Sequence, residues 1–358
     1  MNSLERVLTV INGGIPDRVP VAMHNFLAVG QFIGCDDLSV LLKDGDVMAQ
    51  AQIAAWRELG HDLLQLELGV ASLAQALGAE ARYSSTEPPH VEAPILKSLK
   101  DAENLKLPNP EKDWPLSANI EATRIVCSEI GDRAFICGRA DQGPMALTAA
   151  IRGVENLIYD IMDAQDDPEI ERQLLFLLDF CTRCCTDFGI AQGRAGAHGT
   201  CIGGYGISTI SPKVYRMYEQ PFEKRFAESI KASGIYSFLH ICGDEIEIMP
   251  DMIDTNAQVL EMDPLSDMSR AKSIAGGKVT LLGFVDPANV IGCGTPALIR
   301  EKCREAIEVL APGGGFILSP GCALPVETPA ENMRAVVESA RGMSYNPDGT
   351  IVMARKTI

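Results

Sequence analysis

One short segment combines two residue types that bind soft metal ions. The stretch SFLHICGDE runs from an apolar, strand-like start into His240 and Cys242, followed by a glycine. In an extended chain, residues i and i+2 point to the same side, so the imidazole and the thiol can be directed at one point. Both groups are ligands that suit zinc. A core histidine with satisfied nitrogens and a small buried cysteine would show the same spacing, so the pair alone leaves both interpretations open.

Two further segments could complete a metal site. Cys322 stands in SPGCALPVETP, where Pro320 and Gly321 turn the chain just after an apolar run. Glu261 closes the apolar stretch AQVLE and is the first candidate for a fourth ligand, with Asp263 the second. Zinc sites take three or four ligands of these types. The positions therefore predict one zinc ion shared by three strand ends.

The chain has eleven cysteines, and most of them show no ligand spacing. Cys181, Cys184 and Cys185 form CTRCC, but they lie inside a helical segment and no second CxxC pair follows. We therefore predict core packing for these three rather than a metal or redox role. His198 and Cys201, in HGTC, are additional candidates for lining a pocket.

The elements that must position these residues alternate regularly along the chain. Short β-rich runs are predicted at 19–23, 62–68, 134–137, 195–201, 236–241, 257–261, 278–284 and 315–318. Amphipathic helical runs between them include 169–188, 212–232, 296–310 and 329–341. Eight strands that alternate with helices favour a single (β/α)8 TIM barrel over residues 1–358. The alternative is an open doubly wound sheet, but no GxGxxG follows the first strand.

The stretch 69–133 is Pro-rich, with EPPHVEAPI and LPNPEKDWP, and is expected to be an insertion over the barrel mouth rather than a separate domain. A parallel barrel directs the carboxyl ends of its strands to this mouth, where its chemistry lies. Polar residues that follow the predicted strands should line the pocket there: His24, Asn25, Glu67, Asp141, Gln142 and Tyr205. Asp141, in GRADQGP, is the first candidate for orienting a substrate. For the others, a solvated or capping role is the alternative.

Composition excludes several classes of protein. The net charge is −17, and a polyanion without a basic cluster repels nucleic acid. No run of about 18 apolar residues occurs, and the first residues carry charges rather than an apolar leader. We expect a cytoplasmic protein without membrane contact whose cysteines are thiols. So many reduced thiols also fit an anaerobic cell.

Three phrases together resemble the uroporphyrinogen decarboxylase superfamily. They are the opening RVLTVINGGIPDRVPV, the segment LLGFVDPANVIGCGTP and the closing GGGFILSPGCALPVETPAENMRAVVESAR. The resemblance spans nearly the whole chain and is strongest in its last third. It implies a (β/α)8 barrel with the active site at the carboxyl ends of the strands.

Departures from the family pattern indicate a branch. Where the decarboxylases carry the arginine-rich segment RQAGR after the first strand, this chain reads MHNFLAVGQFIG, without an arginine. The stretch PMALTAAIRG lacks their tyrosine, and GCAL replaces their GHGI after the last strand. HICGD and the SPGC cysteine resemble instead the zinc pattern of the cobalamin-dependent branch, that of methylcobamide:coenzyme M methyltransferases and related demethylating methyltransferases.

That branch implies His240, Cys242 and Cys322 as zinc ligands and as the catalytic centre, while Glu261 as fourth ligand rests on its position after a strand. It implies methyl transfer between cobalamin and a small substrate. The substrate would be a thiol acceptor, or a methoxy or methylthio donor in an O-demethylase-type system. The chain contains no cobalamin-binding DxHxxG signature, so we expect the corrinoid on a small partner protein.

Two other functions stay open from the sequence. The first is decarboxylation of a tetrapyrrole, which needs cationic groups for the substrate carboxylates; the missing arginines argue against it. The second is a non-catalytic corrinoid- or metal-binding protein, which would bind zinc without methyl exchange.

Overall fold

The computed structural model describes residues 1–24, 27–204 and 210–353. Eight parallel strands form one sheet in the order β1-β2-β5-β6-β7-β8-β9-β10. Their bounds are β1 Ala22–Met23, β2 Leu63–Leu66, β5 Phe135–Arg139, β6 Gly199–Ile202, β7 Tyr236–His240, β8 Val259–Met262, β9 Thr280–Val285 and β10 Phe316–Pro320. A parallel bridge between Val21 and Leu318 joins the first strand to the last and closes the ring. The predicted barrel is therefore confirmed.

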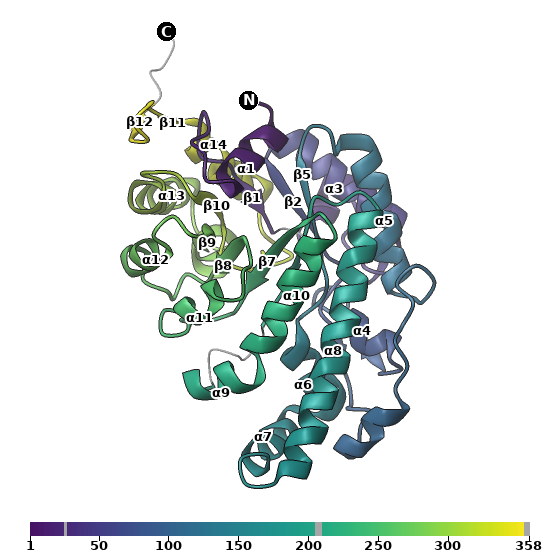
Figure 1. Ribbon diagram of the computed structural model, residues 1–358. Coiled ribbons are helices and arrows are strands. Elements are labelled where there is room, and N and C mark those ends of the chain that lie inside the picture. The colour runs from purple at the N-terminus through teal and green to yellow at the C-terminus, as the bar shows by residue number, and fades with distance from the viewer. Residues whose placement is uncertain (25–26, 205–209, 354–358) are drawn as a thin grey trace.

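Helices surround the strands on the outside (Figure 1). The larger ones are α3 Gly45–Leu59, α5 Leu116–Ile130, α8 Pro168–Arg194, α10 Gln220–Ala232, α12 Met268–Ala275, α13 Pro296–Leu310 and α14 Ala330–Arg341. Side-chain caps explain several starting points: Asp44, Asp167 and Thr295 each accept a hydrogen bond from a backbone N–H in the first turn of their helix. Shorter elements are α1 Ser3–Ile11, α2 Leu38–Leu41, α6 Pro144–Arg152, α7 Val154–Asp163, α9 Pro212–Tyr218, α11 Met249–Ile253, the 3₁₀ turn η1 Val29–Ile33 and the π-helical turn η4 Pro287–Gly292.

One predicted helix is wrong in its continuity. The run 212–232 is broken at Glu219, whose φ of −128° and ψ of −57° separate α9 from α10. Pro221 contributes because it has no N–H for a continuous helix. The predicted helix 296–310 coincides with α13, and 169–188 lies within α8.

The stretch 69–133 holds several small elements before it returns to the barrel wall. They are α4 Ser72–Ala76, the antiparallel pair β3 Ala81–Arg82 and β4 His90–Val91, and the 3₁₀ turn η2 Leu99–Asn104. Its last element, α5, packs against α3 and β2 as one of the outer helices. A second antiparallel pair, β11 Met343–Tyr345 and β12 Ile351–Met353, follows α14.

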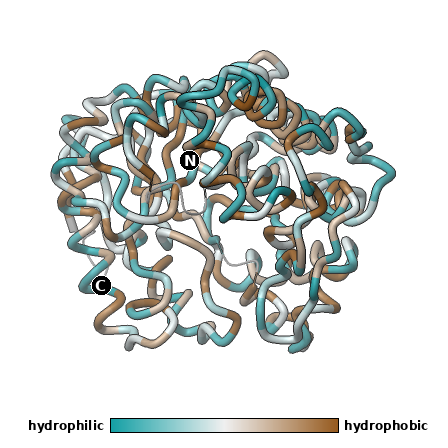
Figure 2. Tube along the Cα trace, turned by 90° about the horizontal axis from the view of Figure 1, so that it is seen from below, coloured by the Kyte–Doolittle hydropathy of each residue, from teal (hydrophilic) through white to brown (hydrophobic). Residues whose placement is uncertain are grey.

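The barrel interior is apolar at the amino-terminal ends of the strands, and α1 closes this end. Val7 and Val10 of α1 pack with one inward-facing residue from most strands: Ala22, Leu63, Phe135, Cys137, Cys201, Phe238, Val259, Leu282 and Ile317. Beside α1, buried Asp62 receives hydrogen bonds from Arg6 at 2.7 Å and from Arg18 at 2.7 Å. Figure 2 shows the hydrophilic segments mainly along the periphery of the molecule. The amino-terminal end is thus a packed floor.

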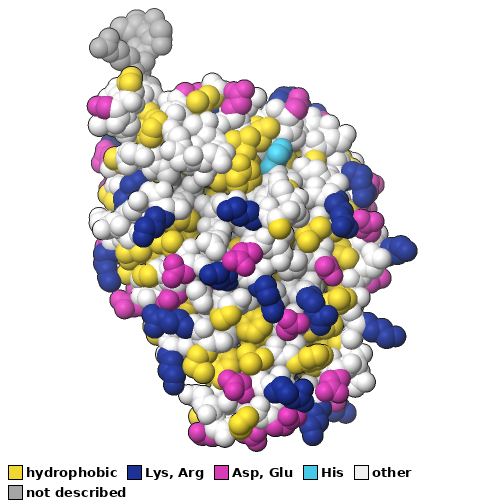
Figure 3. Space-filling view, in the orientation of Figure 1, with side chains coloured by type: hydrophobic (Ala, Val, Ile, Leu, Met, Phe, Trp, Pro, Cys, Tyr) yellow, Lys and Arg dark blue, Asp and Glu magenta, His cyan; other side chains and the backbone are white. Residues whose placement is uncertain are grey.

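The surface mixes charges of both signs over much of the face in Figure 3. Hydrophobic side chains gather in the lower part of that face, over α7 and the start of α8. On α7, the side chains of Val154, Ile158 and Met162 are 52–61% exposed. None of the helices in the described residues is long and apolar enough to cross a membrane.

Candidate metal centre

The inward-facing residues of the strands change character toward the carboxyl ends. Side chains alternate along a strand, so positions two apart share the barrel interior. The floor residue Leu63 is followed at this spacing by Gln65 and Glu67. Phe238 is followed by His240 and Cys242. The apolar floor therefore supports a polar layer near the mouth, and the metal-binding residue types belong to that layer.

Three soft ligand atoms converge in this layer. One ligand atom each from His240, Cys242 and Cys322 lies within 4.8 Å of the other two. His240 Nε2 is 3.2 Å from Cys242 Sγ. A tetrahedral zinc ion with ordinary bond lengths holds a nitrogen and a sulfur about 3.6 Å apart and two sulfurs about 3.8 Å apart. The three residues therefore fit a zinc ion by donor type and by spacing.

The orientation of His240 is fixed from behind. Its Nδ1 lies 3.0 Å from the backbone carbonyl oxygen of Glu261 on the neighbouring strand β8. A carbonyl oxygen only accepts hydrogen bonds, so Nδ1 must carry the ring proton and donate it. Nε2, which faces the sulfur of Cys242, is then the nitrogen whose proton a metal ion would replace, and a second nitrogen held by a carbonyl is the usual arrangement behind a metal-binding histidine.

Cys322 reaches the cluster through a tight turn after β10. The Gly321 N–H donates to the Val285 carbonyl oxygen at 2.9 Å. A Cβ atom on Gly321 would come within 2.5 Å of Pro264 Cδ, so only glycine permits this close approach. The turn brings the thiol from the last strand to the pair on β7.

Cys322 shifts the pKa of His240 and of Cys242, and each of these two side chains shifts the pKa of Cys322. A hydrogen bond with Cys242 lowers the pKa of Cys322 far below its usual range, and that of Cys242 is raised in return. Burial lowers the pKa of His240, but the hydrogen bond to Cys322 outweighs it and raises the value to about 9. A thiolate beside an imidazolium, with a second thiol sharing the charge, is a donor set arranged for a cation.

Glu261 has other partners than this cluster. It is not among the residues whose ligand atoms lie within 4.8 Å of one another. Its carboxylate accepts a hydrogen bond from Gln65 and lies 3.6 Å from Arg139 Nη1. In this structure the carboxylate faces the barrel interior, while its backbone carbonyl supports His240.

A second buried network joins residues at the ends of β1, β2 and β5. His24 Nε2 is 3.0 Å from Glu67 Oε2, and Arg139 Nε is 3.4 Å from the same oxygen. All three side chains are at most 5% exposed. His24 also contributes to the lowered pKa of Cys322, so the network and the metal cluster act on each other electrostatically. The structure thus places two predicted pocket residues, His24 and Glu67, together at the mouth.

Asp141 sits beside this network in a conformation unusual for a non-glycine residue. Its φ is 67°, and its carboxylate accepts a hydrogen bond of 2.6 Å from the Leu73 N–H at the start of α4. Burial raises the pKa of Asp141 to about 7. Asp141, Gln142 and His90 are the polar residues that line an otherwise apolar groove of about 380 Å³ between α4, α6 and α7. Asn25 and Tyr205, also predicted for the pocket, lie outside the described residues.

Two other expectations were partly wrong. His198 precedes β6 at the amino-terminal end, and its Nδ1 accepts a hydrogen bond from the Ile136 N–H at 3.0 Å, so it does not reach the mouth. Cys201 belongs to the apolar floor, although its sulfur lies 3.7 Å from Arg139 Nη1. Strand direction explains His198, because a residue that precedes a strand cannot line the pocket at its carboxyl end. Cys201 is paired in register with Arg139 and packs with the apolar floor residues below the polar layer.

Arg139 and Gln65 were missed from the sequence. Asp141 follows the end of β5, whereas Arg139 is the last residue of that strand, two positions earlier and therefore on the same inward face. A charged residue at the end of an apolar strand, as in FICGR, was the available signal.

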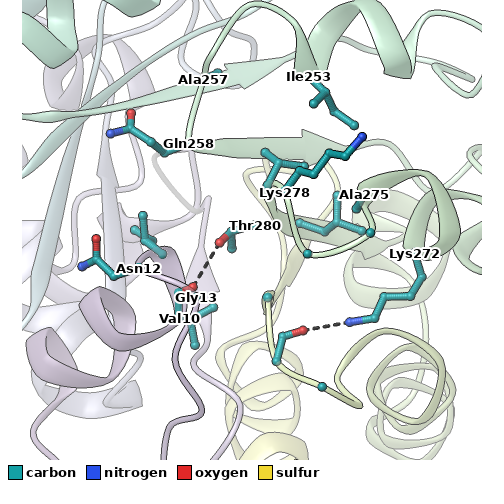
Figure 4. Close-up of a pocket in the computed structure, with 18 of the residues that line it drawn as sticks. Val10, Asn12, Gly13, Ile253, Ala257, Gln258, Lys272, Ala275, Lys278 and Thr280 are labelled. Atoms are coloured by element: carbon teal, nitrogen blue, oxygen red, sulfur yellow. Dashed lines mark hydrogen bonds between the residues drawn. The ribbon is translucent and has the colours of Figure 1, made fainter.

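A larger hollow of about 790 Å³ lies at the opposite end of the barrel (Figure 4). Its polar groups maintain the floor: Thr280 Oγ1 donates to the Val10 carbonyl at 3.3 Å, and Lys272 Nζ donates to the Gly314 carbonyl at 2.8 Å. Because barrel chemistry lies at the carboxyl ends of the strands, we assign this hollow a structural role.

Similarity to known proteins agrees with this geometry. The profile of the family "Uroporphyrinogen decarboxylase (URO-D)" matches residues 2–343. Methylcobamide:CoM methyltransferase MtaA of Methanosarcina barkeri is 25% identical over 351 residues, which cover 95% of this chain and 97% of the relative. A uroporphyrinogen decarboxylase of Psychromonas ingrahamii is 23% identical over 315 residues, 86% of each chain.

Among solved structures, a methyltransferase from Methanosarcina mazei has the same fold. Its TM-score is 0.85 at 23% sequence identity, over 95% of this chain and 98% of its own. Relatives with two different activities therefore share the barrel, and the residues at the mouth must distinguish them.

Proposed function

We propose, on the premise that this chain belongs to the uroporphyrinogen decarboxylase family and is a methyltransferase within it, that it moves a methyl group between a corrinoid and a small substrate held at zinc. The observation that carries the proposal is the convergence of His240, Cys242 and Cys322 at the barrel mouth. No other group of three or more metal-binding side chains with such spacing occurs among the described residues.

In this proposal each side chain in and around the cluster has a separate role. When bound, zinc would act as a Lewis acid toward a sulfur or oxygen atom of the substrate and would lower the pKa of a thiol. His240 presents Nε2 because the Glu261 carbonyl holds its other nitrogen. Cys242 and Cys322 supply negative charge, which keeps a substrate sulfur electron-rich and hence nucleophilic. His24 and Glu67 form a buried pair that can orient a substrate beside the cluster.

The substrate in this proposal is a thiol acceptor, or a methoxy or methylthio donor. The corrinoid is cobalamin carried by a separate small protein in the cytoplasm. Asp141 lies where the polar mouth meets the apolar groove, and we assign it the orientation of the substrate or of the partner's cofactor. Asn25 and Tyr205 remain sequence-based candidates for the same pocket.

Decarboxylation of a tetrapyrrole is the weaker alternative. A substrate with several carboxylates needs free cationic groups. Arg139 is a buried arginine near the mouth, and it already lies 3.4 Å from Glu67 and 3.6 Å from Glu261. A non-catalytic metal-binding role differs from our proposal in predicting zinc without methyl exchange.

The test is a spectroscopic assay of the zinc-loaded protein with methylcobalamin. Loss of the methylcobalamin spectrum with a thiol, or its formation from cob(I)alamin and a methoxyaromatic compound, is the expected result. Conversion of uroporphyrinogen to coproporphyrinogen without zinc would establish the alternative. Bound zinc without exchange with any donor or acceptor would indicate the non-catalytic role.

The matched variants are Cys322→Ala and Cys293→Ala. Cys322→Ala should lose zinc and turnover while the barrel stays folded. Cys293 is exposed and does not belong to the metal cluster, so its replacement should change neither zinc content nor turnover. Retention of stoichiometric zinc in Cys322→Ala would contradict the ligand assignment.

A further inference from the structure

We propose that Arg139 is a positioning residue that holds the Glu261 carboxylate away from the metal, so that the fourth coordination position is kept for the substrate. The inference rests on the proposed zinc site, but it concerns a residue that takes no direct part in metal binding. It also competes with the sequence-based assignment of Glu261 as the fourth ligand, since both cannot hold in the resting enzyme.

Arg139 contacts both Glu67, the partner of His24, and Glu261, the neighbour of His240. It is the last residue of β5, and its side chain is 3% exposed. Nε lies 3.4 Å from Glu67 on the side of His24, and Nη1 lies 3.6 Å from Glu261 on the side of His240. The planar guanidinium can contact two carboxylates at once, which a lysine ammonium cannot do with the same geometry.

The chain reserves space for this guanidinium. A Cβ atom on Gly203, just after β6, would come within 2.3 Å of Arg139 Nη2. Gly203 shows no positive φ, so its backbone does not itself require glycine. The missing side chain therefore serves the position of Arg139 rather than a turn.

Glu261 is held by two partners that do not belong to the cluster. Gln65 donates to one carboxylate oxygen, and Arg139 faces the other. Movement of the carboxylate to a metal ion would separate a buried charge from its counter-charge and leave the Gln65 amide unpaired, both of which are costly in a barrel interior. Glu261 would then act on the metal only through its backbone carbonyl and His240.

This arrangement makes a specific statement about substrate binding. If Glu261 were a resting ligand, a thiol would have to displace it. If Arg139 holds Glu261 back, a thiol meets an open position, and removal of the Glu261 charge leaves thiol affinity unchanged.

The experiment uses the full-length protein with cobalt(II) in the zinc site and 2-mercaptoethanol as the probe thiol. Thiolate-to-cobalt charge-transfer absorption gives the dissociation constant of the probe without any methyl transfer. Variants are Glu261→Gln, Arg139→Met and the double variant. Arg152→Met is the control, because Arg152 also forms an ion pair that is largely shielded from solvent, with Asp160, 2.8 Å away on α7.

The expected pattern has four parts, one for each variant. Glu261→Gln should bind the probe within about threefold of the wild type, the size of a nearly neutral change. Arg139→Met should weaken binding about tenfold, a usual effect of a residue behind a metal ligand, because the freed carboxylate competes for the ion. The double variant should return to the wild-type value. Arg152→Met should behave as wild type.

Tighter thiol binding in Glu261→Gln by tenfold or more would show a displaced ligand and overturn the proposal. So would a double variant as weak as Arg139→Met, since the effect of Arg139 would then not pass through Glu261. Should Arg139→Met not fold, Gly203→Ala displaces the same guanidinium and should weaken thiol binding in the same direction. Failure of the zinc site itself would appear separately, as absence of cobalt binding in the wild type.

Discussion

Sulfur side chains gather in two parts of the molecule, and only one of them has the geometry of a metal site. Cys181, Cys184 and Cys185 lie within one turn of α8, and all are at most 1% exposed. Burial raises the pKa of Cys181 to about 12, so it stays a thiol. Cys242 and Cys322 are 80 positions apart (322 − 242), half-buried, and converge on the His240 ring.

The contrast shows that closeness in sequence does not make a ligand set. On α8 these cysteines are neighbours, but an apolar environment favours the neutral thiol, and no third type of metal ligand joins them among the described residues. At the mouth, the strand β7 and the turn at Gly321 after β10 direct three side chains from two strands to one point. A charged network that includes Arg139 lies beside them. Metal chemistry belongs to the second environment.

The largest expected difference in zinc content and methyl-transfer rate is between a substitution of a zinc ligand and a substitution of a cysteine in α8. Cys242→Ser should lose zinc and reduce methyl transfer by at least about a hundredfold, because a zinc ligand is removed. Cys184→Ala should retain one zinc per chain and wild-type turnover. Elemental analysis and the methylcobalamin assay measure both. Equal zinc loss in the two variants would mean that the comparison is wrong.

Removal of the metal should lower thermal stability only in proteins whose zinc site at the mouth is intact. Zinc that binds only the folded chain stabilises it by about 2.7 kcal/mol when free zinc is about a hundredfold above its dissociation constant. Chelation should therefore lower the Tm of the wild type and of Cys184→Ala by the same amount, measured by calorimetry. His240→Ala should show no shift on chelation. A chelator-dependent shift that survives in His240→Ala would place the metal elsewhere.

Much of this arrangement could be predicted from the sequence because it follows from local alternation. The eight strands and their helices were evident from period-two and amphipathic patterns, and the i, i+2 spacing of His240 and Cys242 needs only an extended chain. The convergence of Cys322 followed from its place after the last strand. These features depend on residues near one another in sequence or on barrel symmetry.

What escaped prediction depends on contacts between distant elements. The break at Glu219 places that buried side chain against the Met145 N–H at the start of α6, 3.1 Å away, and nothing within residues 212–232 encodes this partner. The partners of Glu261 are similar: Gln65 and Arg139 lie on strands β2 and β5, far from it in sequence. Strand ends can be predicted from one sequence, but the pairing of buried charges needs the folded barrel.

The smallest expected effect concerns the packing of the helical cysteines. Cys184→Ala removes one buried sulfur atom and should destabilise the fold by about 1 kcal/mol, comparable to a small truncation in a core. Urea unfolding of the zinc-free protein measures this without a contribution from the metal, and Cys293→Ala serves as an exposed control that should change stability little. Because burial rather than ligation holds these thiols, the loss should be the same with and without zinc. A larger loss in the presence of zinc would couple α8 to the metal centre and give CTRCC a role beyond packing.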